Sequence, residues 1–402
     1  MSNMIHKNKV RDFMSDKFLL TCIDCGKPFF TEGEKEFYEA RHFVMPKRCK
    51  SCRSIRKAAL AAKQQAKAND LLQKEEQHQI NSLLSELPYA TCFISDLVIP
   101  CPAQTLYIIG NGFDLMHGVP SSYYRFRDFL GKRSQLRRKL ELWNLKEDLW
   151  ADFEDSLAHM DHERMIETLP DHRENMGVLD EDDDDFSAAD FFIAIESSIE
   201  PLQIIQRELP SQFRKWINTL YPSNPNRPLI SLLHHEGKYL TFNYTEFVET
   251  LYAIPPENVF YIHGDRRNKN QKLILGHALG AEYEPPYLEI SKQPAYTDQT
   301  SYDLHEIAYQ YVGDYYNTTT KDSSTIIHDN QDYFHGLKSI KDIIIIGHSL
   351  SSVDFLYFEE IMKNCPEANW SIGWHSSSDL KRIHAFINDL SIAPEKIKLF
   401  QT

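Results

Sequence analysis

The chain has 402 residues, of which 42% are hydrophobic and 25% charged, a composition typical of a folded globular protein and not of a disordered one. Its formal net charge of −14 is unevenly distributed, because residues 1–90 hold 16 lysines and arginines against 11 aspartates and glutamates. The remaining body is strongly acidic, which argues against a main domain wrapped by nucleic acid. Any basic surface for such a contact must lie within the first 60 residues.

The length predicts two or three domains, and two is our working number. The first residues include Lys and Arg but no apolar signal-peptide core, and no later segment has 18 consecutive apolar residues. We therefore expect no secretion, no membrane span and a cytosolic location. Of the seven cysteines, four are clustered and three scattered, and disulfides are not expected in that compartment.

The four clustered cysteines form two Cys-x-x-Cys pairs, Cys22 with Cys25 and Cys49 with Cys52. Two residues between cysteines allow both thiolates to reach one ion, so the spacing predicts a structural four-cysteine zinc site in a domain over residues 1–57. Four unconnected cytosolic thiols are the alternative.

The same segment resembles a family of short zinc-ribbon domains in its Cys-x-x-Cys-Gly-x-x-Phe opening and its second cysteine pair. Basic residues cluster around that second pair: Lys47, Arg48, Lys50, Arg53, Arg56 and Lys57. This basic rim offers a contact for nucleic acid or for an acidic protein partner. A solvated basic face is the alternative.

Residues 55–87 are rich in Ala, Gln, Lys, Glu and Leu and contain neither Gly nor Pro, which predicts one exposed helix. Its leucines are too irregular for sustained heptads, so we favour a linker helix over a coiled coil. We assign residues 58–99 to this helix and a connector, and 100–402 to the main domain.

Short apolar runs predict the strands of the main domain: 105–109, 239–242, 259–262, 272–275, 342–346 and 370–372. Several are continuously apolar, as expected for parallel strands covered on both faces. The fold class predicted is α/β, a Rossmann-like doubly wound parallel sheet. A helical insertion is expected at about 122–238, where the acidic run 180–185 is either a solvated loop or a cation site.

Each predicted strand runs directly into Gly, Asn, His or Ser, so polar groups should collect at the carboxyl edge of the sheet, where open α/β sheets bind ligands. The first such loop, Gly110-Asn111-Gly112-Phe113-Asp114, opens a helix and suits a pyrophosphate. Position 115 is leucine where the dinucleotide fingerprint has its third glycine, which disfavours an ordinary dehydrogenase.

The stretch 110–120 is similar to the first NAD-binding loop of sirtuin-like proteins, with glycines at 110, 112 and 118 and a following Val-Pro. Three later segments keep the sirtuin order: 241–244 resembles the Thr-Gln-Asn-Ile motif, 262–264 the His-Gly motif, and 346–350 the late nucleotide loop. Asp114 replaces a sirtuin serine and Thr245 a sirtuin acidic residue, so a nucleotide other than NAD stays open.

Five motifs in order resemble the bacteriophage abortive infection AbiH family over about residues 104–376: 109–123, 150–154, 242–252, 262–264 and 347–354. The resemblance implies an antiphage effector that shuts down an infected cell, with a phage component as trigger. Self-assembly into a homo-oligomer is expected by analogy with such effectors.

Carried over from the sirtuin motifs, Asn243 would position ribose or water and His263 would act as general base in NAD hydrolysis. The residues expected to hold NAD or a related nucleotide are Gly110, Asn111, Gly112, Phe113, Asp114, His117, Thr245, Gly347, His348, Ser349 and Asp354. Glu154 either reaches the cleft or pairs with a base. Asn243 and His263 also admit purely structural roles.

The first hypothesis is therefore an effector with NAD glycohydrolase activity and a zinc ribbon that senses a phage component or recruits a partner. The alternative is a non-catalytic nucleotide-binding sensor or assembly module, whose zinc ribbon binds nucleic acid or a protein. A nuclease is weaker, because no carboxylate cluster suited to two metal ions stands out.

Overall fold

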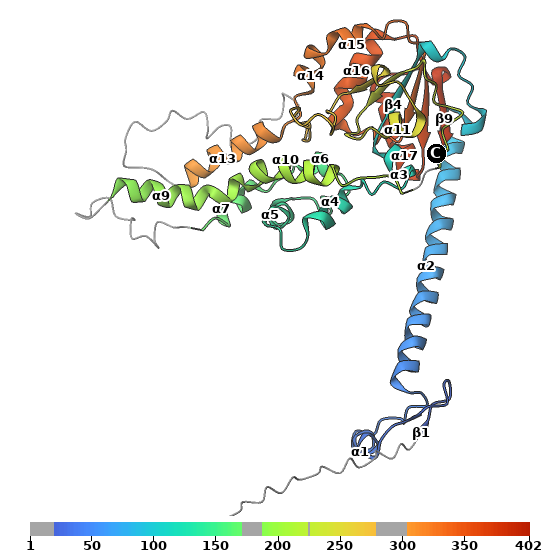
Figure 1. The fold of residues 1–402 in the computed structure, drawn as a ribbon, viewed down its shortest axis with the longest axis vertical. Helices are drawn as coiled ribbons and strands as arrows, with labels where there is room; N and C mark the ends of the chain where they lie inside the picture. Colours follow the sequence, from blue (N-terminus) through green and yellow to red (C-terminus); the bar gives the residue numbers. More distant parts are fainter. Residues whose placement is uncertain (1–19, 171–186, 224–225, 279–303) are drawn as a thin grey trace, which may run out of the picture. The chain divides into compact units, whose positions relative to one another are not determined.

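The computed structural model describes residues 20–170, 187–223, 226–278 and 304–402 (Figure 1). The chain divides into two compact units, Met1–Asn81 and Ser82–Thr402. The acidic run at 180–185 lies outside the described residues. No helix within the described ranges has the length and apolar character needed to cross a membrane.

The first unit contains a short hairpin, a short helix and most of a long one. Strand β1 (Leu20–Thr21) pairs antiparallel with β2 (Pro28–Phe29), and helix α1 (Glu32–Ala40) follows. The Thr31 side chain accepts from the Glu34 backbone N–H while the Glu34 carboxylate accepts from the Thr31 N–H, a capping box that fixes the start of α1. Helix α2 (Lys50–Glu86) confirms the predicted single helix and begins five residues earlier than predicted.

The second unit is built on a parallel sheet, which confirms the predicted α/β class. Its strands are β3 (Ala90–Phe93), β4 (Thr105–Ile109), β5 (Lys238–Thr241), β6 (Val259–Tyr261), β7 (Asp342–Ile346), β8 (Asn369–Trp374) and β9 (Ile397–Gln401). Every side chain of β4, and all but the first of β7, is buried, as expected for central strands covered on both faces.

The strand order is β3-β9-β8-β7-β4-β5-β6. From β4 the chain moves outward through β5 and β6, then returns to the other side of β4 and moves outward through β7, β8 and β9. Ile109 lies opposite both Thr241 of β5 and Ile346 of β7, so the carboxyl ends of three strands are level. Successive strands are therefore added in opposite directions on the two sides of the β4–β7 boundary. Doubly wound sheets form a ligand crevice at such a switch point.

Helices cover the sheet and extend from it as a lobe (Figure 1). Between β4 and β5 lie α3 (Asn111–Met116), α4 (Tyr123–Leu130), α5 (Gln135–Trp143), α6 (Phe153–Ser156), α7 (His162–Glu167), α9 (Ala188–Ile199) and α10 (Ile204–Ile217). The later helices are α11 (Phe247–Tyr252), α13 (Leu304–Thr319), α14 (Ser323–Asp329), α15 (Gln331–His335), α16 (Phe355–Asn364) and α17 (Ser377–Asp389). The short 3-10 turns are η1 (Ile94–Asp96), η2 (Pro102–Gln104), η3 (Glu200–Gln203), η4 (Pro256–Asn258), η5 (Ser352–Asp354) and η6 (Pro394–Lys396).

The helical lobe is larger than the sequence suggested, because α13, which follows β6 in the chain, packs against α7, η3, α9 and α10 of the insertion. Tyr315 of α13, Trp143 of α5 and Tyr107 of β4 belong to one continuous hydrophobic core. The lobe and the sheet thus share a core, and the lobe is an integral wall of the unit.

One predicted strand is absent, and two observed strands were not predicted. Lys272–Leu275 is not a strand: Ile274 donates one backbone hydrogen bond to the His263 carbonyl (2.9 Å), and the segment otherwise makes no ladder among the described residues. Strands β3 and β9 were not predicted. β3 carries the largely exposed sequence Ala-Thr-Cys-Phe at the sheet edge, which lacks the apolar run that marks central strands.

Candidate functional site

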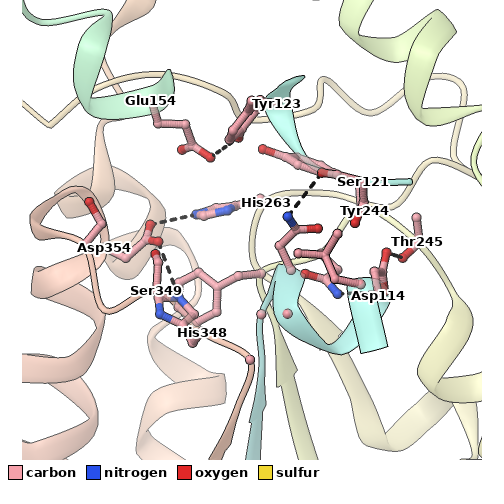
Figure 2. A pocket seen from close by; sticks show the side chains of 18 of the residues that line it. Asp114, Ser121, Tyr123, Glu154, Tyr244, Thr245, His263, His348, Ser349 and Asp354 are labelled. Carbon is pink, nitrogen blue, oxygen red and sulfur yellow. Dashed lines mark hydrogen bonds and ion pairs between the residues drawn. The ribbon is translucent and has the colours of Figure 1, made fainter. Parts of the chain in front are cut away.

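A cavity of about 650 Å³ lies at the carboxyl edge of the sheet (Figure 2). Its walls come from the loops after β4, β5, β6 and β7, together with α6 and α10 of the helical lobe. The predicted site residues that line it are Gly110, Asn111, Gly112, Asp114, Asn243, Thr245, His263, Gly347, His348, Ser349 and Asp354. The structure therefore brings eleven residues from four separate motifs to one place.

The glycines at the switch point allow two backbones to touch. Gly112 donates its N–H to the Gly347 carbonyl (2.7 Å), and a Cβ on Gly112 would lie 2.6 Å from the Gly347 Cα. A Cβ on Gly110 would likewise lie 2.5 Å from the His348 Cα. Gly347 itself has a φ of 64°, in the left-handed region that favours glycine. Close packing of the two loops is therefore enough to require glycine at these positions.

Asp114, on helix α3, is the centre of a buried cluster that joins the loops after β4 and β5. Its carboxylate accepts hydrogen bonds from Asn243 Nδ2 (2.9 Å) and Thr245 Oγ1 (2.6 Å), and the side chains of all three residues are buried. Burial raises the pKa of Asp114 to about 7, against the opposing effect of these two hydrogen bonds. One N–H of the Asn243 amide is thus engaged, which leaves its second N–H and its carbonyl oxygen for a ligand.

His263 follows β6 and is buried beneath the cavity, packed edge-on to Phe242 and Tyr357. Its Nε2 lies 3.5 Å from Asp354 Oδ1, and no hydrogen bond to that nitrogen is made by the described residues. Burial, and then the positive charge of Lys321, lower the pKa of His263 to about 3. The imidazole is therefore neutral at cellular pH.

Asp354 in η5 lies between two histidines and a lysine. Its Oδ2 is 3.4 Å from His348 Nε2, while His348 Nδ1 accepts the Leu350 backbone N–H (2.9 Å), so the neutral His348 ring carries its proton on Nε2. Burial acts to raise the pKa of Asp354, but the charge of Lys321 and the hydrogen bond with His348 hold it well below its usual range.

Glu154 both reaches the cavity and pairs with a base, which joins the two alternatives drawn from the sequence. Tyr123 donates to Glu154 Oε1 (2.6 Å), and Lys321 Nζ lies 2.5 Å from Glu154 Oε2 (Figure 2 shows the first of these). Lys321 was missed by sequence reasoning. It is a single lysine after a helix, and nothing in its neighbours marks it as buried.

Two residues expected to hold a nucleotide lie elsewhere. His117 is fully buried, with Nδ1 2.7 Å from the Phe113 carbonyl and Nε2 2.7 Å from the Tyr252 hydroxyl. Neither His117 nor Phe113 lines the cavity. Phe113, on α3, and His117, at its C-terminal end, both contact Tyr252 and so fix α3 against α11.

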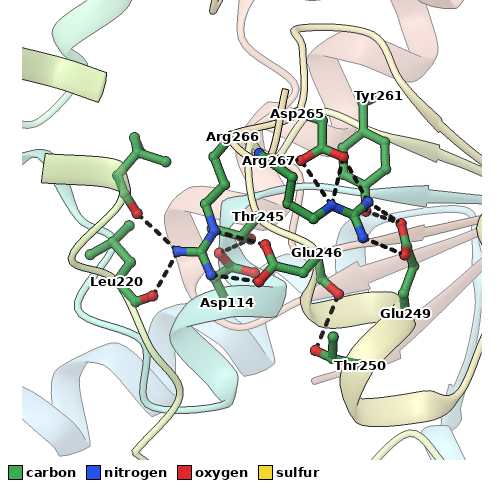
Figure 3. A network of polar contacts seen from close by, with 11 residues as sticks. Asp114, Leu220, Thr245, Glu246, Glu249, Thr250, Tyr261, Asp265, Arg266 and Arg267 are labelled. Carbon is green, nitrogen blue, oxygen red and sulfur yellow. Dashed lines mark hydrogen bonds and ion pairs between the residues drawn. The ribbon is translucent and has the colours of Figure 1, made fainter. Parts of the chain in front are cut away.

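An arginine network supports the cavity wall beside Asp114 (Figure 3). Arg266 binds Glu246 through two hydrogen bonds of 2.7 Å and donates to the carbonyls of Ile217 and Leu220 (2.9 and 2.7 Å). This ties the end of α10 to the loop after β6. Arg267 pairs with Glu249 and Asp265 but is 43% exposed. The network fixes loops, and neither Arg266 nor Arg267 lines the cavity.

The site formed by the four clustered cysteines has the geometry that zinc requires. The sulfurs of Cys22, Cys25, Cys49 and Cys52 all lie within 4.8 Å of one another. Cys25 Sγ and Cys49 Sγ are 3.8 Å apart, which equals the separation of about 3.8 Å given by tetrahedral Zn–S bonds of about 2.3 Å. The first pair follows β1, with Gly26 at a φ of 67°, and the second lies at the start of α2. These four residues would hold a structural zinc ion.

Comparison with protein families gives two matches. The model described as Bacteriophage abortive infection AbiH matches residues 106–374, which is more than half of the chain. The chain belongs to the AbiH family. A model described as Probable treble clef domain matches residues 15–60, in agreement with a second cysteine pair carried by a helix. Comparison with curated proteins and with solved structures gives no significant match.

AbiH membership implies a role in bacteriophage abortive infection. The match extends from β4 to the last residue of β8, so it includes every loop that contributes His263, Asn243 and Asp354 to the cavity. The treble clef, in contrast, lies wholly outside the AbiH match.

Proposed function

We propose that the cavity of this AbiH protein binds NAD or a related nucleotide and hydrolyses its glycosidic bond, as the effector step of phage defence. The observation that carries the proposal is the place of His263 and Asn243 at the switch point of a doubly wound sheet, in a cavity of about 650 Å³. Departure of nicotinamide generates positive charge on the ribose, and a neutral imidazole can accept the proton of a ribose hydroxyl or of water.

The charge of the cavity favours a cationic reacting group. Its lining includes Asp114, Asp152, Glu154, Asp354 and Asp379. Arg382 is the one lysine or arginine that the described residues contribute to the lining, and it is paired with Asp379. Such a wall suits a pyridinium ring and an oxocarbenium-like transition state better than it suits a nucleoside triphosphate.

Nicotinamide release from NAD tests the proposal, with and without phage lysate, because a phage component is the proposed trigger. We expect Asn243→Ala and His263→Gln to lower release by about 100-fold or more. His335→Gln, at an exposed histidine on α15, is the matched control and should behave as wild type. Absence of nicotinamide release in every arm with lysate would refute hydrolysis.

A sensor that binds a nucleotide without cleaving it is the second candidate. It is favoured by the engagement of both Asn243 and Thr245 with Asp114, which leaves fewer groups free to orient water. Calorimetric binding of NAD without nicotinamide release would support it. In either case self-assembly on activation is part of the proposal, and light scattering with and without lysate tests it.

For the treble clef we propose contact with nucleic acid or with an acidic protein surface through its basic rim. Lys50 and Arg53 are exposed, whereas Arg48 pairs with Asp24. Binding that weakens steeply with salt, and is lost in a Lys50→Glu/Arg53→Glu variant that still holds zinc, would support this contact.

A further inference from the structure

A lysine buried behind the cavity connects three separated segments. The Lys321 side chain is 0% exposed and follows α13. Its Nζ lies 3.0 Å from Asp354 Oδ1, in η5, and 2.5 Å from Glu154 Oε2, in α6. Burying an ammonium between two carboxylates costs desolvation free energy, so a functional role for this lysine is worth testing.

The same carboxylate oxygen faces the histidine. Asp354 Oδ1 is 3.0 Å from Lys321 Nζ and 3.5 Å from His263 Nε2. The ammonium makes the hydrogen bond, whereas Nε2 of the histidine has no partner among the described residues. Lysine and a protonated histidine would therefore compete for one anionic oxygen.

The other titratable groups around His263 do not compete for Asp354 Oδ1. His348 contacts the second oxygen of Asp354, and its ring packs edge-on against Phe242. The Tyr357 and Tyr244 rings face His263 from α16 and from the loop after β5, and burial raises the pKa of both phenols, so they stay neutral. Glu154 accepts hydrogen bonds from Lys321 and Tyr123.

We propose that Lys321 is a positioning residue, which holds Asp354 as an anion and keeps His263 neutral with Nε2 ready to accept a proton. The role of His263 as base rests on the function proposed above, but its charge state does not depend on any nucleotide. When Nε2 accepts a proton from a hydroxyl, the O–H bond breaks, the N–H bond forms, and the new imidazolium lies beside Asp354. The lysine keeps its proton throughout.

The test measures the charge of His263 in the full chain without nucleotide. Histidine ring signals are followed by NMR from pH 5 to 8, with the His263 signal assigned by its loss in His263→Gln. In wild type we expect no titration in this range. In Lys321→Met/Glu154→Gln, which removes one charge of each sign, we expect the His263 titration to move upward by about two pH units or more, which brings it into the measured range.

Three further variants complete the experiment. Lys321→Met alone leaves two facing carboxylates without their cation and is at risk of not folding, so the charge-balanced double variant decides. Lys321→Arg retains the cation and should leave His263 as in wild type. Lys363→Met, at a lysine whose side chain is 71% exposed on α16, is the control for loss of a distant charge. A His263 signal that titrates identically in wild type and in the folded double variant overturns the proposal.

The two proposals fail in different ways. If His263 shifts as expected but NAD is not cleaved, Lys321 still sets the charge of the histidine and the hydrolytic function falls. If NAD is cleaved while the double variant leaves the His263 titration unchanged, hydrolysis stands and the role of Lys321 falls. Nicotinamide release and the NMR titration are therefore independent measurements.

Discussion

The two units of this protein are stabilised in different ways. Within residues 20–57, all of which are described, only Cys22 and Phe30 are buried. In the second unit one continuous core reaches from the sheet through the helical lobe. A segment with so little buried apolar surface depends on its metal, whereas the α/β unit is stabilised by its own core.

Metal removal should have the largest effect, because it should unfold the first unit and leave the second folded. Cys22→Ser/Cys25→Ser should abolish zinc binding and unfold residues 20–57, since structural zinc contributes about 10 kcal/mol or more to such sites. Elemental analysis should find about one zinc per chain in wild type, and limited proteolysis should show cleavage confined to the first unit. Cys92→Ser, outside the cluster, is the control. A metal-free chain that resists protease in this segment would contradict the prediction.

Loss of a buried arginine should have the next largest effect, in the other unit. Arg266→Met leaves Glu246 and two backbone carbonyls without their partner, and we expect a loss of about 3–5 kcal/mol in the free energy of unfolding. Arg267→Met, at the exposed neighbour, leaves the buried Glu249 with its hydrogen bond from Tyr261 and should cost less, about 1–3 kcal/mol. Urea unfolding of the α/β unit measures both. Equal losses of unfolding free energy in the two variants would show that the burial of Arg266 does not make its contribution larger than that of Arg267.

Asp114 should make the stability of the α/β unit depend on pH. Its pKa is about 7 in the folded state and about 3.9 unfolded, so the folded state keeps a proton that the unfolded state has lost. Stability should therefore fall by about 2 kcal/mol as pH rises from 5 to 7. Asp114→Asn removes this titration, and urea unfolding at pH 5, 6 and 7 should give a flatter profile. Parallel profiles in the two proteins would disprove it.

The smallest effect is expected in the metal-dependent unit. Gly33 lies in the first turn of α1, and a Cβ there would meet no atom within 4 Å. Gly33→Ala should therefore stabilise the helix by about 0.5–1 kcal/mol. The measurement is the chelator concentration that removes half of the zinc, which should rise slightly. A decrease would mean that α1 needs the glycine for a reason other than space.

Local pattern was sufficient for part of this fold. The bounds of β4 and β7 match the predicted ranges because both strands are central and continuously apolar. The cluster of four cysteines was likewise predictable, since its spacing is set by one ion. The segment Lys272–Leu275 has the same apolar character yet forms no strand, because pairing depends on a neighbour that sequence does not reveal.

The site divides in the same way. Motif order predicted that Asn243, His263 and Asp354 lie near one another, and all three line the cavity. The sequence could not show that His117 turns away to bind Tyr252, or that Lys321 joins the network, since both depend on the packing of distant helices. Contacts over 33 and 167 residues have no local signature.

The contact of Lys321 with Glu154 and Asp354 also limits how the gene can be recombined. A chimera that exchanges residues 122–238 with those of a relative would keep Lys321 and Asp354 but replace Glu154. If the donor lacks a carboxylate at that place, the host lysine loses one of its two buried counter-charges. Exchange of the lobe therefore succeeds only when the donor segment also has an acidic residue at position 154. Suitable crossover points thus depend on this ion pair as well as on the strand boundaries.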